Sequence, residues 1–133
     1  MKRLFLLLLG IFACISVHAE IGFYKADAFA FKYSEDNGRW KEWSDWDNSD
    51  ILISIDYDKE IITVYSEMEQ RYIIVKSNGE YSDVNGGKQT EFTVVDQDGD
   101  IGVIRVRIQK NGVAQLYVEF DNIMWVYSGL KAI

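Results

Sequence analysis

The stretch TEFTVVDQDGDIGVIRVRIQKNGVAQLYVEF, residues 90–120, contains three runs in which β-branched and aromatic residues alternate with polar ones. This two-residue period is typical of antiparallel strands with one buried face. The runs are separated by Asp98-Gly99 and Asn111-Gly112, residue pairs that tolerate the positive φ angles of tight hairpin turns. The stretch therefore predicts three consecutive antiparallel strands joined by two turns.

The same pattern extends through the rest of the chain. In ILISIDYD, residues 51–58, isoleucines alternate with serine and aspartate, as expected for a half-buried strand. Further strands are predicted in the runs FYKADAFAFKY, IITVYS, QRYIIVK and IMWVYS, residues 23–33, 61–66, 70–76 and 123–128. Further turns are predicted at Asn37-Gly38, Glu67-Met68-Glu69, Asn78-Gly79, Asn85-Gly86-Gly87 and Asp121-Asn122.

The order of these elements predicts an all-β fold of about eight antiparallel strands. Because most links are short, we expect an up-and-down meander that closes into a small or flattened barrel, similar in class to calycin and lipocalin barrels. A two-sheet β-sandwich is the alternative. In the first strand, Phe23, Phe29, Phe31 and Tyr33 are predicted on one face and the alanines between them on the other.

The N-terminal segment, MKRLFLLLLGIFACISVHAE, has the parts of a secretory signal peptide. Lys2 and Arg3 precede an apolar run that is too short to span a bilayer, and a small-x-small motif predicts cleavage after Ala19. We therefore expect a signal peptide over residues 1–19, a single β domain over residues 20–133, and a secreted or periplasmic protein without a transmembrane segment. Alternatively, the run ending at Cys14 is similar to a bacterial lipoprotein box, which implies a lipid anchor there.

Composition limits the chemistry of the mature chain. Cys14 and His18 are the sole cysteine and histidine, and both precede the predicted cleavage site. Without them the chain has no disulfide, no thiol or Ser-His nucleophile, and no thiolate or imidazole zinc ligand. Removing Lys2 and Arg3 leaves 12 basic against 21 acidic residues, a net charge of 12 − 21 = −9. Such a charge argues against binding to nucleic acid, and we predict no cofactor and no catalytic residue.

The acidic run DQDGD, residues 96–100, is similar to the start of an EF-hand calcium loop. An EF-hand needs glycine at the sixth loop position and a carboxylate at the twelfth, where this chain has Ile101 and Arg107. We therefore interpret the run as a hairpin with Asp98-Gly99 at its tip and predict no metal site. Arg105 and Arg107 share one strand face, where we expect ion pairs with neighbouring carboxylates, or an anion clamp if that face points inward.

The segment RWKEWSDWDNSD, residues 39–50, places Trp40, Trp43 and Trp46 at every third position. This spacing is similar to the tryptophan motif of thrombospondin type 1 repeats, a family that depends on disulfides absent here. Two interpretations remain open. The rings plug an open end of the barrel, or they form an exposed platform beside Asp45 and Asp47. The predicted ligand site therefore comprises Trp40, Trp43, Trp46, Asp45 and Asp47. Trp125 lies in a predicted strand and is expected to belong to the core or to line the barrel.

Together these features predict a non-enzymatic binding module of unknown ligand, with a carbohydrate or a partner protein as the expected target. The alternative is a secreted inhibitor that acts through its acidic loops. A third hypothesis is a hydrolase that uses two carboxylates, with candidates among Asp45, Asp47, Asp50, Glu67 and Glu69.

Overall fold

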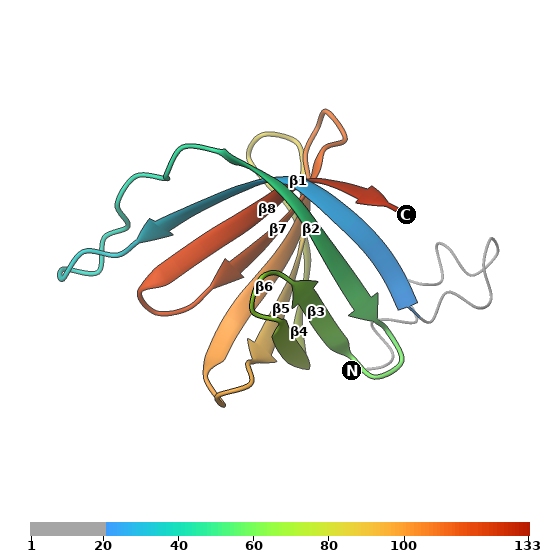
Figure 1. Cartoon of the computed structure of the whole chain (residues 1–133). Helices are drawn as coiled ribbons and strands as arrows, with labels where there is room; N and C mark the ends of the chain where they lie inside the picture. Colours follow the sequence, from blue (N-terminus) through green and yellow to red (C-terminus); the bar gives the residue numbers. More distant parts are fainter. Residues whose placement is uncertain (1–20) are drawn as a thin grey trace.

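The structure, a computed structural model, describes residues 21–133, which form eight antiparallel strands and no helix. The strands are β1 (Ile21–Tyr33), β2 (Asp47–Asp56), β3 (Ile61–Tyr65), β4 (Gln70–Ser82), β5 (Lys88–Val95), β6 (Ile101–Ile108), β7 (Ala114–Glu119) and β8 (Ile123–Ala132). Each strand pairs with the next, and β8 pairs with β1, so the sheet closes into a barrel (Figure 1). The predicted meander barrel is confirmed, and the sandwich alternative is wrong.

Some predictions concern residues outside this range. The signal peptide, its cleavage after Ala19 and the lipid anchor at Cys14 lie outside the described residues. Within residues 21–133, no helix is long and apolar enough to cross a membrane.

The core inside the barrel is formed by alternate residues along the strands. Ile104 is completely buried, while its neighbours Arg105 and Arg107 lie on the outer face. The residues with no exposed surface come from β2, β3, β5, β6 and β7: Ile53, Ile62, Val64, Val94, Ile104, Leu116 and Val118. Burying one such side chain contributes about 1.5–3 kcal/mol. The residues that alternation placed on the apolar face of β2, β5, β6 and β7 therefore form the core.

Most of the predicted turns are confirmed. Gly99 and Gly112 adopt φ angles of 86° and 87°, in the left-handed region that glycine tolerates best. Their amides donate to the carbonyl oxygens of Asp96 and Gln109, respectively, which closes each hairpin.

The predicted turn at Asn78-Gly79 is wrong. These residues lie inside β4, which continues to Ser82, and the pairing between β4 and β5 shifts register between Ser77 and Gly79. Gly79 has a φ of 99°, so the glycine supports a β-bulge rather than a chain reversal. Asn78-Gly79 correctly indicated a positive φ angle, but this angle occurs both in β-bulges and in hairpin turns.

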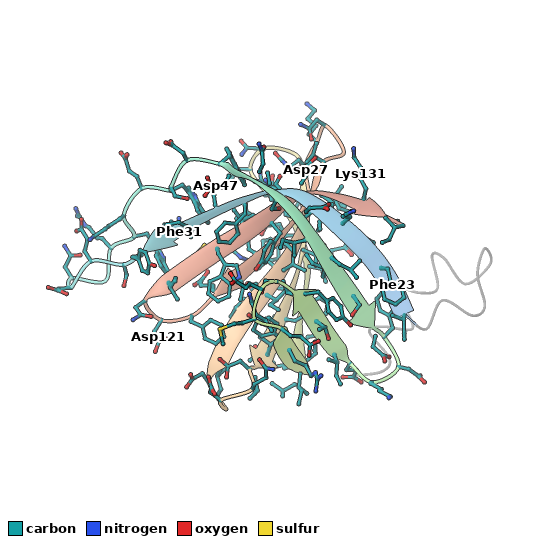
Figure 2. All side chains as sticks on the ribbon, in the orientation of Figure 1. Phe23, Asp27, Phe31, Asp47, Asp121 and Lys131 are labelled. Atoms are coloured by element: carbon teal, nitrogen blue, oxygen red, sulfur yellow. The ribbon has the colours of Figure 1, made fainter. Side chains whose placement is uncertain are left out.

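The predicted single face of β1 is also wrong. Ala26 belongs to the buried core and Phe29 packs against it, whereas Phe23 lies on the outside and is 41% exposed. The strand therefore changes the face it turns inward between Ala26 and Phe29, where its pairing with β2 shifts register between Ala26 and Ala28. Figure 2 labels Phe23, Asp27 and Phe31 along this strand.

β8 changes face at the same level of the barrel. Gly129 is an extra residue between the paired positions Leu130 and Ser128, and its φ is 70°. A glycine in the left-handed region is typical of one class of β-bulge. Tyr127 points into the core on one side of the bulge, and Leu130 lines the interior on the other.

Candidate functional site

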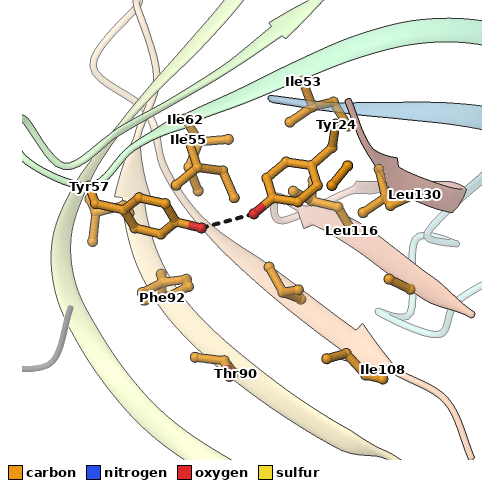
Figure 3. Close-up of a pocket in the computed structure, with 14 residues that line it drawn as sticks. Tyr24, Ile53, Ile55, Tyr57, Ile62, Thr90, Phe92, Ile108, Leu116 and Leu130 are labelled. Carbon is orange, nitrogen blue, oxygen red and sulfur yellow. Dashed lines mark hydrogen bonds between the residues drawn. The ribbon is translucent and has the colours of Figure 1, made fainter. Parts of the chain in front are cut away.

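The barrel holds an internal cavity of about 320 Å³ near the end where β6 joins β7. All eight strands contribute to its wall, and the lining is mostly aliphatic (Figure 3). Ile53, Ile62 and Leu116 are completely buried and belong to the core cluster. Protein interiors are normally close-packed, with few voids larger than a water molecule. A space of this size is therefore a candidate ligand site.

Two tyrosines give the cavity its polar feature. The hydroxyl groups of Tyr24 and Tyr57, which both line the cavity, are 3.1 Å apart and form a hydrogen bond (Figure 3). Gly22 leaves room for this arrangement, because a Cβ atom there would lie 2.9 Å from the Tyr24 hydroxyl oxygen. Burial raises the pKa of Tyr57 well above its ordinary value, and the hydrogen bond with Tyr24 raises it further. The phenol is therefore neutral at physiological pH.

The composition of the lining defines what the cavity can hold. The described lining residues are aliphatic or aromatic except for Thr90, and none carries a charge. A cavity of about 150 Å³ accommodates benzene, so twice that volume holds roughly ten to twelve non-hydrogen atoms. Burying an ionised group without a partner is costly. The geometry therefore suits a small, uncharged and largely apolar molecule.

A second hollow lies at the opposite end of the barrel, where the tryptophan segment joins β2. Its volume is about 410 Å³, with Phe29, Trp125 and Tyr127 on one side and Asp47 and Gln70 among its polar residues. The Gln70 amide donates to Ser66 Oγ at 3.0 Å and to Tyr127 Oη at 3.2 Å. Because its amide is engaged within the protein, Gln70 stabilises this end of the barrel. Trp125 is partly buried, packs against the core cluster and lines this hollow.

The tryptophan segment lies outside the barrel wall. Neither Trp40, Trp43 nor Trp46 belongs to the core cluster of residues 21–133. The Lys32 ammonium lies 4.4 Å from the ring centre of Trp43, and that ring packs edge-on against Tyr117 at 6.0 Å. Tyr117 is on the outer face, because its neighbours Leu116 and Val118 are buried in the core. Lys32 is on the same side, because it lies three residues after Phe29, which packs against the core.

The three rings do not belong to the core cluster of the described residues. Trp40 and Trp43 lie against side chains of the outer wall, and Trp43 is still 38% exposed. Trp46 is the most exposed, at 54%. Ser44 anchors the segment, since its Oγ accepts a hydrogen bond from the Phe31 amide and donates to the Asp45 carbonyl. A ligand contact at these rings remains a prediction.

The predicted acidic site residues do not gather into one site. Asp45 is exposed, and Asp47 is an exposed residue at the rim of the second hollow. Two of the other carboxylates proposed for a hydrolase pair with neighbouring cations: Asp50 with Lys25 at 2.9 Å, and Glu69 with Arg71 at 3.0 Å. Both ion pairs lie on the exposed surface of the barrel.

The two arginines of β6 form the ion pairs that the sequence predicted. Arg107 Nε lies 2.8 Å from Asp83 Oδ2, and this contact lowers the pKa of the Asp83 carboxyl. Arg105 lies 3.4 Å from Glu119, and its guanidinium stacks over the ring of Tyr117 at 4.9 Å. Because this face is external, neither arginine reaches the internal cavity.

The DQDGD run forms the predicted hairpin tip. Asp96, Asp98 and Asp100 bring carboxylate oxygens within 4.8 Å of one another. Asp96 Oδ1, however, accepts hydrogen bonds from the backbone amides of Asp98 and Asp100, both at 2.9 Å. This is the side-chain-to-backbone pattern by which aspartate stabilises turns.

We expect Asp96→Ala to lower the free energy of unfolding by about 1 kcal/mol, the usual net contribution of such hydrogen bonds. Chemical denaturation measures the change. Asp98→Ala is the matched control, since its exposed carboxylate makes none of these turn contacts. Equal losses in the two variants would show that the Asp96 hydrogen bonds do not hold the turn.

The internal cavity was not predicted from the sequence. Its lining residues carry the same signal as ordinary core residues, so period-two alternation cannot separate a filled barrel from a hollow one. Alternation in ILISIDYD did place Ile53, Ile55 and Tyr57 on the inner face correctly.

Comparison of this chain with protein-family models, curated proteins and solved structures found no match. The fold and the cavity therefore provide the basis for a functional assignment.

Proposed function

We propose that this protein is a non-enzymatic binding module that holds a small apolar molecule inside its barrel. The observation that carries the proposal is the aliphatic cavity of about 320 Å³ at one end of a closed sheet. Ligand pockets are typically concave and mostly apolar, with a few polar groups that fix orientation. We further propose, from the N-terminal sequence, that the module acts outside the cytoplasm.

The Tyr24–Tyr57 pair defines the polar end of the ligand. Each phenol can donate one hydrogen bond and accept others, so a single ligand oxygen beside the pair would be stabilised. The absence of charge among the described lining residues disfavours a carboxylate. The ligand is therefore an uncharged molecule of roughly ten to twelve non-hydrogen atoms with a hydroxyl or carbonyl group at one end.

We expect 1-decanol to bind and sodium decanoate to bind at least tenfold more weakly, because the carboxylate loses its hydration without gaining a cation. Methyl NMR spectra of the isoleucines provide the readout. Ile62 and Ile74 line the cavity, whereas their neighbours Ile61 and Ile73 belong to the outer face of the same strands. Decanol should shift the first two signals and leave the second two unchanged.

Two variants, substituted at adjacent positions, test whether decanol binds in the cavity. Ala114→Phe places a ring in the cavity wall, whereas Val113→Phe adds the same ring at the neighbouring position, which does not line the cavity and is 37% exposed. We expect the first variant to lose decanol binding and the second to keep it. Binding that survives Ala114→Phe, or isoleucine shifts spread evenly over both faces, would rule out the cavity as the site.

The inhibitor alternative and the glycan or protein target stay predictions. Exposed acidic side chains and the exposed ring of Trp46 are compatible with them. The cavity is favoured because it combines enclosure, apolar lining and a defined polar end in one place.

A further inference from the structure

A groove on the outer wall of the barrel gathers positive charge under the tryptophan segment. It is about 400 Å³ in volume and is lined by Lys32 of β1, Arg105 and Arg107 of β6, and the rings of Trp40 and Trp43. These residues come together because β1, β8, β7 and β6 are successive neighbours in the closed sheet (Figure 1). The groove is separate from the internal cavity, with which it shares no lining residue.

Two of the three cations are incompletely satisfied. The ion pairs found within residues 21–133 do not include Lys32, whose ammonium lies against Trp43 at 4.4 Å and Trp40 at 5.6 Å. The Nε atom of Arg105 is buried and makes no hydrogen bond within the described residues. Its Nη2 atom lies 3.4 Å from Glu119 Oε1 and 3.5 Å from the Met124 sulfur, a weak acceptor.

The local charge is opposite to that of the whole chain. Three cations face two carboxylates here, namely Glu119 and Asp83, while the full sequence has a net charge of −7. Burial lowers the pKa of Lys32, and the nearby charge of Arg105 lowers it further, whereas Glu119 opposes the change. A partly buried group of like charges in an acidic protein favours a bound anion.

We propose that this groove is a binding site for an organic anion that carries a carboxylate on a ring. The carboxylate would lie between Lys32 and Arg105, where charge-assisted hydrogen bonds are available. The ring would lie beside the indole of Trp43, which is 38% exposed. Arg107, already paired with Asp83, adds positive potential without contacting the ligand.

Benzoate is the probe, and benzamide is its uncharged counterpart of the same shape. We expect benzoate to shift the indole N–H signals of Trp40 and Trp43 in NMR spectra and to bind at least tenfold more tightly than benzamide, because one charged hydrogen bond is worth that factor. Bound benzoate should also raise the pKa of Lys32, followed through its side-chain carbon signals, because a nearby anion favours the ammonium form.

Lys25 provides the matched control. Lys32→Gln should weaken benzoate binding about tenfold, whereas Lys25→Gln removes a lysine from the same strand that pairs with Asp50 outside the groove, and should leave binding unchanged. Equal binding of benzoate and benzamide would overturn the proposal. So would an unchanged Lys32 pKa at saturating benzoate, a measurement on the unsubstituted protein that does not depend on the folding of a variant.

Discussion

Replacing Ile104 by alanine should lower the free energy of unfolding by about 2–5 kcal/mol, the range for truncating a buried isoleucine. Ile104, a residue of β6, has no exposed surface and belongs to the core cluster. Its removal leaves a cavity that the closed sheet cannot collapse to fill, because every strand is hydrogen-bonded on both sides. Urea denaturation monitored by tryptophan fluorescence measures the loss.

The control is the same substitution at the first residue of the same strand. Ile101 is 69% exposed and lies on the outer face of β6, so Ile101→Ala should change stability by less than about 0.5 kcal/mol. Two equal losses would contradict the assignment of inner and outer faces. An unchanged midpoint for Ile104→Ala would do the same.

Gly129→Ala should destabilise the protein by about 1–3 kcal/mol, the cost of holding an ordinary residue in a disfavoured backbone region. The φ of Gly129 is 70°, and an added Cβ atom would lie 2.1 Å from Asp27 Oδ1 on the neighbouring strand. The bulge at Gly129 also turns Leu130 toward the cavity. Decanol binding should therefore weaken together with stability. Denaturation measures the loss of stability, and methyl NMR measures the loss of decanol binding.

Two further variants separate the causes of this loss. Asp27→Ala removes the carboxylate that the new methyl group would meet, so the double variant should recover the steric part of the loss and retain the backbone part. Gly129→Asn in the Asp27→Ala background should recover more, since asparagine tolerates positive φ better than alanine. If Gly129→Ala matched the original protein in stability, the bulge would not require glycine.

Strand content and connectivity were predictable because they rest on local signals. In residues 90–120, alternation set the buried face, and Asp98-Gly99 and Asn111-Gly112 set the chain reversals. Short links between strands left the meander as the favoured topology. The Arg105 and Arg107 ion pairs followed from the same alternation, since a face opposite Ile104 has to be external when Ile104 is buried.

The errors occurred where one local signal serves two structures. Asn78-Gly79 indicated positive φ, which both a turn and a bulge satisfy, and only the pairing with β5 selects the bulge. The change of face in β1 has no marker in FYKADAFAFKY, because Ala26 is small enough to suit either side of the sheet. In the tryptophan segment, polar and apolar residues are mixed, so the local pattern does not show which surface the rings contact. That surface is the outer wall of the barrel, which forms only when the strands pair.

The amino-acid sequence by itself determined that this chain forms antiparallel strands, where most of them reverse, and which residues of each strand are apolar. These properties depend on neighbours along the chain, through side-chain period and turn geometry. Tertiary structure alone decided that β8 closes on β1, that the interior keeps an unfilled volume beside Tyr24 and Tyr57, and that Lys32 lies near Arg105. Those features depend on distances between residues far apart in sequence, which side-chain volumes and bulge positions set when the sheet closes.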